Sequence, residues 1–272
     1  MAITTKSGLQ TALRGGQYIH WPKGNSGNTS SQGHWGSSFD SAPNGGTLAG
    51  TSTAAGVVPD STTAGCPTIN SFGGSNTGYL GQFTVDHNTT SAPNGCRYQI
   101  NDMLFKAGAY AFNSAVTLAS QPSYSARVPG TDYKGLQIWI ETTTGFTGIP
   151  SIAITYTNEG GTAARTTGTI AMPAALAIRR MFQMPLQAGD NGVQKIESVT
   201  CTVASAGNFN VLVLRPLAQV YAMNSGLEQT WGPDQLGLPI VYSTSALYVM
   251  QCTQLNTNVM PDFQTGITII QG

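Results

Sequence analysis

Residues 151–170 read SIAITYTNEGGTAARTTGTI, and this stretch decides the fold class. In its first half, Ile152, Ile154 and Tyr156 alternate with small or polar residues, which is the period of a strand with one buried face. The run NEGG at 158–161 supplies turn residues that reverse a chain between paired strands. The stretch therefore predicts a β-hairpin with residues 163–170 as its second strand.

The same period of two recurs on both sides of this hairpin. Leu136, Ile138 and Ile140 alternate with polar residues, and residues 209–214 are apolar on both faces, as in a strand at the centre of a sandwich. Further strands are expected at 79–85, 97–105, 181–186, 193–203, 247–252 and 267–270. Many short strands with frequent turns predict a mainly β protein, a β-sandwich of jelly-roll type.

Helical periodicity is confined to two short segments. Thr4 or Thr5 is a suitable N-cap for a helix over 5–14, and Gly15 with Gly16 ends it. A helix of this length is marginal alone, so its apolar face must pack on the same chain or on a neighbouring subunit. A second helical segment is expected near 173–178.

Residues 22–77 form a Gly/Ser/Thr/Asn-rich region with isolated bulky side chains. Two readings fit: an arm that extends over a neighbouring surface, or long loops that cover one end of the same sandwich. The expected organisation is an N-terminal helix or anchor at 1–21, this arm or loop region at 22–77, and a sandwich domain at 78–272. Candidates for contacts with neighbouring subunits are Leu9, Leu13, Trp21, Trp35, Phe39 and Phe72.

Charge is scarce and balanced. Only 9% of residues are charged, against roughly 25% in a typical soluble domain, and neutral polar residues and glycine replace them. Twelve basic and twelve acidic residues give a net charge of zero, so no nucleic-acid partner is expected. Uncharged polar surfaces suit wide protein–protein contacts, because no ions are desolvated. No apolar run long enough to cross a membrane and no signal peptide is found, so we expect production in the cytoplasm.

Motifs for catalysis or metal binding are missing from the sequence. The histidines (His20, His34, His87) have no metal-ligand spacing, and the run DNG at 190–192 reads as a turn. The Gly-Asn-Ser-Gly run at 24–27 has no separate domain to supply a histidine and an aspartate. Carboxylates available for a glycosidase-like pair are Asp132, Glu141, Glu159 and Glu197, without a pattern that selects two of them. We therefore expect no enzymatic activity, no metal and no cofactor.

The cysteines and two tryptophans leave alternatives open. Cys66, Cys96, Cys201 and Cys252 are expected as free thiols in a reducing cytoplasm, with a Cys66–Cys96 pair as the alternative in an extracellular particle. Trp139 and Trp231 are candidates for stacking on a glycan, although buried or interface aromatic residues are more common on a sandwich.

Several segments resemble structural proteins encoded by tailed bacteriophages. They are 1–16, 156–166 (YTNEGGTAART), 185–193 (PLQAGDNGV), 206–209, 214–218 and 236–239. These are turn and strand sequences, and residues 22–78 match in character only. The resemblance implies a virion component, a decoration or cement protein of the capsid head.

This resemblance sets the remaining expectations. The partners would be the major capsid protein and further copies of this chain, as a homotrimer, with no membrane partner, and the location would be the virion. Two alternatives remain within the particle: a receptor- or glycan-binding module of a head fibre or tail, and a structural subunit of the neck, tail or baseplate.

Overall fold

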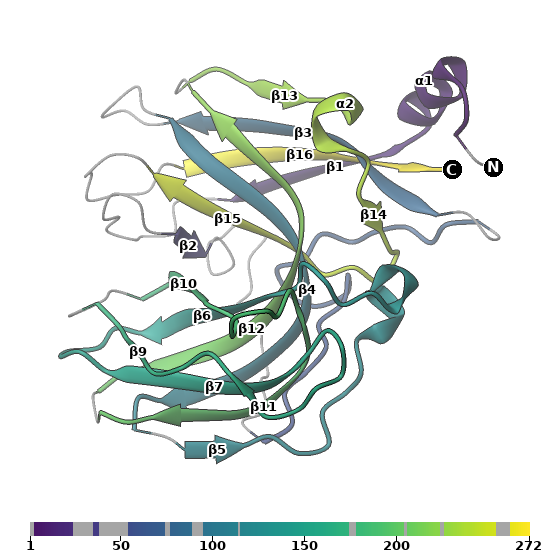
Figure 1. Ribbon diagram of the computed structural model, residues 1–272. Coiled ribbons are helices and arrows are strands. Elements are labelled where there is room, and N and C mark those ends of the chain that lie inside the picture. The colour runs from purple at the N-terminus through teal and green to yellow at the C-terminus, as the bar shows by residue number, and fades with distance from the viewer. Residues whose placement is uncertain are drawn as a thin grey trace.

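The computed structural model of the chain describes residues 3–23, 35–37, 54–73, 77–88, 95–113, 115–173, 178–203, 206–223, 226–253 and 262–272. The strands form three antiparallel sheets, which Figure 1 shows one above another. The mainly β class and the short N-terminal helix are confirmed. The second expected helix, near 173–178, falls largely on residues outside this description.

The upper sheet has the order β1-β16-β3-β13, and β14 also pairs with β3. Its strands are β1 (Gln17–Lys23), β3 (Gly78–Asn88), β13 (Gln229–Trp231), β14 (Ile240–Val241) and β16 (Asp262–Gln271). Helix α1 (Lys6–Arg14) precedes β1, and the Thr5 hydroxyl caps it by accepting a hydrogen bond from Gly8 N at 3.0 Å. Leu13 packs over this sheet at Gly81, where a Cβ atom would lie 3.1 Å from Leu13 Cδ2. Glycine at 81 thus leaves room for Leu13 to pack closely on the sheet.

The middle sheet closes on itself as a barrel in the order β10-β2-β15-β4-β12-β6. Its strands are β2 (Trp35–Ser37), β4 (Cys96–Ala111), β6 (Gln137–Thr144), β10 (Arg180–Met184), β12 (Asn208–Ala222) and β15 (Leu247–Thr253). Its interior, the barrel core, is rich in methionine and aromatic residues: Met103, Trp139, Met181, Leu212, Leu214, Ala246, Tyr248 and Met250. Unbranched methionine fills irregular gaps in such an interior.

The lower sheet has the order β5-β11-β7-β8, and β9 also pairs with β7. Its strands are β5 (Ala115–Thr117), β7 (Ser151–Asn158), β8 (Arg165–Thr166), β9 (Ile170–Ala171) and β11 (Val193–Cys201). The predicted hairpin is confirmed, because Thr155 pairs with Thr166 and Tyr156 with Arg165. Its second strand is shorter than expected, since pairing with β7 stops after β8 and resumes only at β9.

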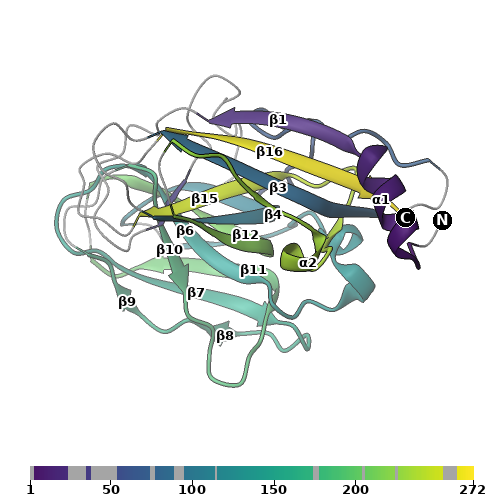
Figure 2. The ribbon, with the colours of Figure 1, turned by 90° about the horizontal axis from the view of Figure 1, so that it is seen from above.

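Two long strands, β4 and β12, connect the upper and lower halves of the molecule. Near one end they pack on the upper sheet, in an upper core that includes Ile100 and Leu217. Toward their other end they pack on the lower sheet, in a lower core that includes Leu104 and Val213. Register shifts interrupt their pairing at Val213/Leu214 and near Pro216, which lets the ladder bend between the two cores. Figure 2 shows the same arrangement from above.

The described part of the region 22–77 packs on the chain's own body. Val57 forms a β-bridge with Lys106, the Ser61 hydroxyl donates to Ser243 O at 2.7 Å, and Ile69 is part of the upper core. Residues 57, 61 and 69 of this region thus contact the same body. The short helical segments are α2 (Pro233–Leu236), η1 (Ser125–Arg127) and η2 (Pro129–Thr131).

A single sandwich of jelly-roll type is not confirmed. Strands β4 and β12 are buried on both faces over most of their length, so one face serves the barrel core while the other serves the upper or lower core. Alternation within one short segment shows which residues share a face. It does not show that a strand continues past a bulge into a second core.

Candidate functional site

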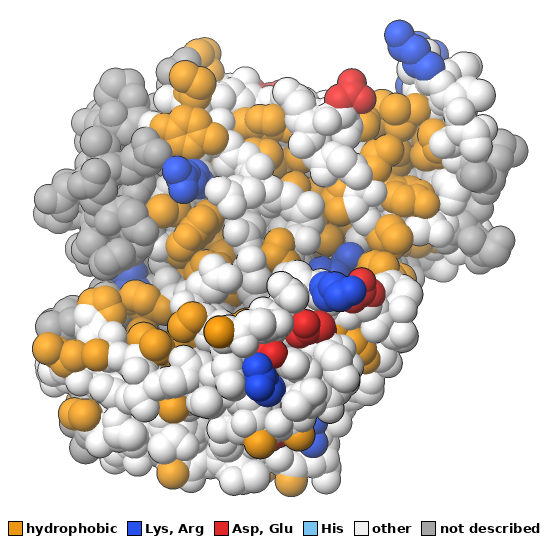
Figure 3. Space-filling view, viewed as in Figure 1, with side chains coloured by type: hydrophobic (Ala, Val, Ile, Leu, Met, Phe, Trp, Pro, Cys, Tyr) orange, Lys and Arg blue, Asp and Glu red, His pale blue; other side chains and the backbone are white. Residues whose placement is uncertain are grey.

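The most prominent functional candidate is a surface that we call the loop end. Among the described residues, the exposed large hydrophobic side chains other than Tyr18 all lie next to strand ends on one side of the molecule: Ile149, Ile178, Val203, Tyr221, Met223 and Leu227. In Figure 1 the corresponding strand ends lie on the left of both halves, and in Figure 3 hydrophobic side chains are visible there.

Turn chemistry explains why these side chains are exposed. Ile149 lies between Gly148, which has a φ of 87°, and Pro150, in the loop that connects β6 and β7. Leu227 follows Gly226, which has a φ of 74°, just before β13. A positive φ is the conformation that glycine adopts readily, so the chain reverses there and directs its neighbours outward. Ile149 and Leu227 are thus held at turns instead of inside strands.

The loop end is suited to bind protein. Met223 is 63% exposed, Leu227 57% and Ile149 55%. Burying such side chains removes apolar surface from water, at about 25 cal/mol per Å². Methionine and aromatic residues are also enriched at the centres of protein interfaces. Exposed apolar side chains that gather on one side of a protein are typical of an interaction surface.

Leu9 and Leu13 remain partly exposed on α1, at the opposite end of the molecule from the loop end. No residue of α1 is fully buried, although Leu13 touches the upper sheet. The helix therefore keeps part of its apolar face available, and its role as an anchor stays a prediction.

Most of the other expected contact residues are used inside the chain. Trp21 is 1% exposed in the upper core, so its assignment as a contact residue is wrong for this conformation. Trp35 packs against Trp139 with ring centroids 6.1 Å apart, and Phe72 packs against the upper core. Phe39 lies outside the described residues. Bulky side chains in a glycine-rich region thus cover the chain's own cores.

The two candidate glycan-stacking tryptophans both pack inside the chain, to different extents. Trp139 is 2% exposed in the barrel core, and its Nε1 donates to Gln137 Oε1 at 2.9 Å. Trp231 is half-buried and stacks on Phe83, with centroids 6.1 Å apart and an interplanar angle of 28°. Trp139 alternates with Ile138 and Ile140 along β6, and both faces of this strand are buried.

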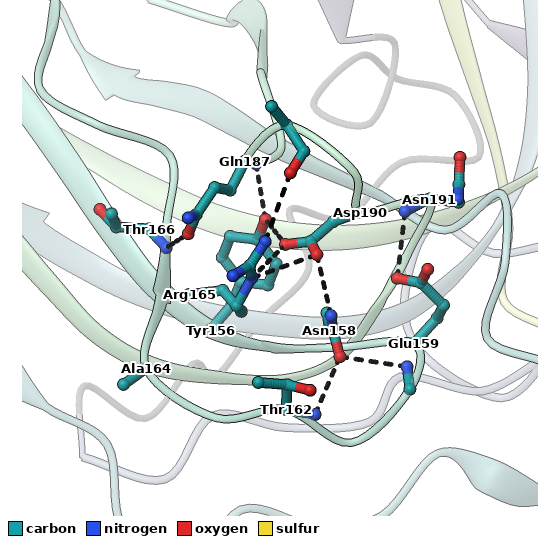
Figure 4. Close-up of polar contacts among 12 residues, drawn as sticks. Tyr156, Asn158, Glu159, Thr162, Ala164, Arg165, Thr166, Gln187, Asp190 and Asn191 are labelled. Carbon is teal, nitrogen blue, oxygen red and sulfur yellow. Dashed lines mark hydrogen bonds and ion pairs between the residues drawn. The ribbon is translucent and has the colours of Figure 1, made fainter.

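A polar network links the β7–β8 hairpin to the loop before β11, and Figure 4 shows its members. The Asp190 carboxylate accepts hydrogen bonds from three side chains: Tyr156 OH at 2.6 Å, Asn158 Nδ2 at 2.8 Å and Arg165 Nε at 2.9 Å. The Arg165 guanidinium, followed by the other two donors, lowers the pKa of Asp190 to about 2. We call this group the Asp190 clasp. It holds two neighbouring loops together.

Backbone donors complete the Asp190 clasp. Glu159 Oε2 accepts from Asn191 N at 3.0 Å and from Gly192 N at 3.1 Å. Asn158 Oδ1 accepts from Gly160 N and Thr162 N, which fixes the hairpin turn. These hydrogen bonds to the side-chain oxygens of Glu159 and Asn158 stabilise the hairpin turn and the loop before β11. The turn of this loop lies at 188–189, where Asp190 N donates to Gln187 O at 3.0 Å, whereas Gly192 forms a β-bridge with Lys134. The turn expected at 190–192 therefore lies earlier in the chain.

A second buried carboxylate lies where β4 and β12 pass between the two halves. Asp102 is fully buried and pairs with Arg127 Nη1 at 2.9 Å and with Arg215 Nη2 at 3.1 Å. It also accepts from Ser245 Oγ at 2.8 Å and from Ala246 N at 3.0 Å. We call this group the Asp102 hub. Burial is the main cause that lowers the pKa of Arg127.

Backbone carbonyls accept further hydrogen bonds from the two arginines of the Asp102 hub. Arg127 donates to Thr244 O at 3.0 Å and Met103 O at 2.9 Å, and Arg215 donates to Ile240 O at 3.0 Å. The guanidinium of Arg215 also lies 5.4 Å from the Tyr242 ring centroid, a cation–π distance. Two buried cations with one carboxylate are therefore held by carbonyls and an aromatic ring.

The four carboxylates considered for catalysis each have local partners. Glu197 accepts from Thr157 Oγ1 at 2.7 Å, and Glu141 accepts from Asn210 Nδ2 at 3.1 Å inside the barrel. Asp132 is exposed and lies 3.7 Å from the Lys134 ammonium. Glu159 belongs to the Asp190 clasp. In the described part of the chain, no three or more His, Cys, Asp or Glu side chains are grouped so as to hold a metal ion.

None of the four cysteines forms a disulfide, and Cys66 and Cys96 pack in different places. Cys96 is buried in the upper core, where burial raises the pKa of its thiol to about 12, and Cys66 packs against the barrel core. None of the helices in the described ranges has the length and apolar character needed to span a bilayer.

No protein-family model and no curated protein matches this chain. Among solved structures it is similar to "Structure of infectious bursal disease virus Gx strain", with 10% identity, 94% of this chain and 80% of that chain covered, and a TM-score of 0.19. It is similar also to the structure of the Gt strain of the same virus, with 10% identity, 72% and 65% covered, and a TM-score of 0.15. TM-scores this low support no conclusion on fold or function.

Sequence reasoning did not single out the loop end. Its signal is nevertheless present, because Ile149 and Leu227 are isolated hydrophobic residues beside glycine or proline. A hydrophobic residue inside turn chemistry has no strand to bury it, and that is the pattern that would have identified this surface.

Proposed function

We propose that this chain is a non-enzymatic structural subunit of a bacteriophage particle, a decoration or cement protein that binds the outer surface of the major capsid shell. The observation that carries the proposal is the loop end, where exposed hydrophobic side chains from both halves face one side. The resemblance of several segments to structural proteins of tailed phages supports it.

The composition favours a wide protein–protein contact over a catalytic site. With 9% charged residues, the surface desolvates few ions when it is covered by another protein. A cement protein must hold neighbouring shell subunits together through many weak contacts, and rigid β-sheets with apolar loop ends meet that requirement. The partially exposed α1, with Leu9 and Leu13, provides a further contact for a neighbouring copy in the proposed homotrimer.

Binding of the purified chain to shells that lack it tests this proposal. In co-sedimentation, the wild-type chain is expected to bind shells with saturable stoichiometry. Replacing both Met223→Asp and Leu227→Asp places charges in the centre of the contact and should weaken binding about tenfold or more. Both side chains are exposed, so the fold should be retained.

Tyr18 provides a matched control. It is 63% exposed, as is Met223, but lies at the start of β1, far from the loop end. The variant Tyr18→Asp should bind shells as the wild type does. A chain that binds no shell, or a double variant that binds as well as Tyr18→Asp, would overturn the assignment.

A further inference from the structure

A polar groove lies at the other end of the lower sheet. Its walls are the chain that leads from β5 to η1 and the paired ends of β7 and β11, and its volume is about 390 Å³. This size is within the range of roughly 300–1,000 Å³ for small-ligand pockets. The side chains that matter for recognition are Ser120, Gln121, Ser125, Tyr133, Gln194 and Lys195.

The groove is built on fixed elements. The side-chain amide of Gln121 donates to Ile196 O, which holds one wall against β11. The Tyr124 hydroxyl donates to Val193 O at 3.2 Å, and the rings of Tyr124 and Tyr133 meet edge to face with centroids 6.2 Å apart. Tyr133 is therefore held by the lower core while it lines the groove. A preorganised surface of this kind loses little entropy when a ligand binds.

The chemistry of the lining is that of a sugar site. Gln194 Nε2 donates to Glu159 O at 2.8 Å, which leaves its amide oxygen as an acceptor for a ligand hydroxyl. The serine hydroxyls both donate and accept hydrogen bonds, and the Tyr133 ring offers an apolar surface to the C–H groups of a sugar ring. Side chains that fix hydroxyl groups beside one aromatic ring match the alternating polar and apolar surface of a carbohydrate.

Lys195 adds charge selectivity. It is the one ionised side chain in the lining, and it forms no ion pair with any residue in the described ranges. An ammonium group in a groove without a lining carboxylate favours an anionic ligand. We propose that this groove binds an acidic oligosaccharide whose sugar carboxylate pairs with Lys195 while a sugar ring packs on Tyr133.

The position of the groove is compatible with the capsid role but does not depend on it. Ile149 precedes the start of β7 and Val203 follows the end of β11, whereas the groove uses Thr157 and Lys195 at the opposite ends of these strands. A strand of eight residues spans roughly 25 Å. A chain held through its loop end therefore presents the groove away from its partner.

Isothermal titration calorimetry with uronate hexasaccharides (alginate, galacturonate and hyaluronan) tests the proposal, with isomaltohexaose as the neutral probe. At least one uronate should bind, at least tenfold more tightly than isomaltohexaose and more weakly as salt is added. Lys195→Gln should weaken that binding about tenfold. Tyr133→Ala should abolish uronate binding. If Tyr133→Ala fails to fold, Lys195→Gln still tests the proposal.

Lys134→Gln is the matched control. Lys134 is 65% exposed, adjoins Tyr133 in sequence and does not line the groove, so this variant should bind the uronate as the wild type does. The proposal is overturned if no uronate binds at millimolar concentration, or if isomaltohexaose binds equally well. It also fails if Lys195→Gln and Lys134→Gln have the same effect, or if sodium acetate competes as strongly as the hexasaccharide.

Discussion

Asp102 and Asp190 are both carboxylates with almost no exposed surface that pair with arginine, yet they hold very different amounts of the chain. The Asp102 hub joins β4, η1, β12 and the loop before β15, which are far apart in sequence. The Asp190 clasp joins a hairpin to a loop only 25 to 34 residues away. The Asp102 hub connects the two halves of the molecule, whereas the Asp190 clasp fixes only one hairpin and the loop beside it.

Burial of the cationic partner separates the two networks further. The Arg127 and Arg215 side chains are 4% and 10% exposed, whereas that of Arg165 is 25% exposed. A guanidinium that keeps contact with water retains part of its hydration when its partner is removed, and a buried one does not. The contribution of an aspartate–arginine pair to stability therefore depends on how deeply the arginine is buried.

The largest effect is expected from Asp102→Asn. This change removes the only carboxylate of the Asp102 hub and leaves two buried guanidinium groups uncompensated, which should lower the free energy of unfolding by about 3–5 kcal/mol. Urea denaturation of the purified chain measures it. Asp132→Asn, at an exposed carboxylate paired with Lys134, should change the free energy of unfolding by less than about 0.5 kcal/mol. Equal effects of the two variants would contradict the distinction.

A smaller and local effect is expected from Asp190→Asn. The loss of charge-assisted hydrogen bonds from Arg165 and Tyr156 should lower the free energy of unfolding by about 2 kcal/mol. Amide hydrogen exchange should show faster exchange at 158–166 and 187–193, with β4 unchanged. A uniform loss of protection, or a destabilisation as large as that of Asp102→Asn, would show that the clasp also supports the whole fold.

The smallest effect concerns pH. The pKa of Asp190 is lowered to about 2, chiefly by Arg165, from a typical value of about 3.9. Its stabilising contribution is therefore complete above about pH 4 and is lost as the pH falls through about 2. A carbon-13 NMR titration of the Asp190 carboxyl should give a midpoint near 2. A midpoint near 4 would mean that Arg165 does not hold the carboxylate in solution.

Local sequence patterns account for much of the fold. The alternation at 152–156 with the NEGG turn gave β7 and its hairpin, and Thr5 with Gly15 marked the ends of α1. Residues 17–23 were not expected as β1, because Gln17, His20, Pro22 and Lys23 interrupt the apolar pattern at the edge of a sheet. Barrel closure depends on β2 and β10, which pair with strands distant in sequence, so no local pattern could reveal it.

Interaction residues were harder to predict from sequence than strands. Trp21 and Trp139 looked available for partners, but tertiary packing buries both. The hydrophobicity of a side chain predicts that it will be buried. Which residues bury it depends on contacts between strands that are distant in sequence. The loop end and the Lys195 groove are assembled from separate loops, so only the folded chain shows that their members lie together.

A cryo-electron reconstruction of a particle assembled with this chain tests the central claim, binding to a capsid shell through the loop end, most directly. The account predicts density on the outer surface of the shell, with Ile149, Met223 and Leu227 against the major capsid protein and the Lys195 groove facing solvent. Density at the neck, tail or baseplate, or a loop end that faces solvent, would contradict it.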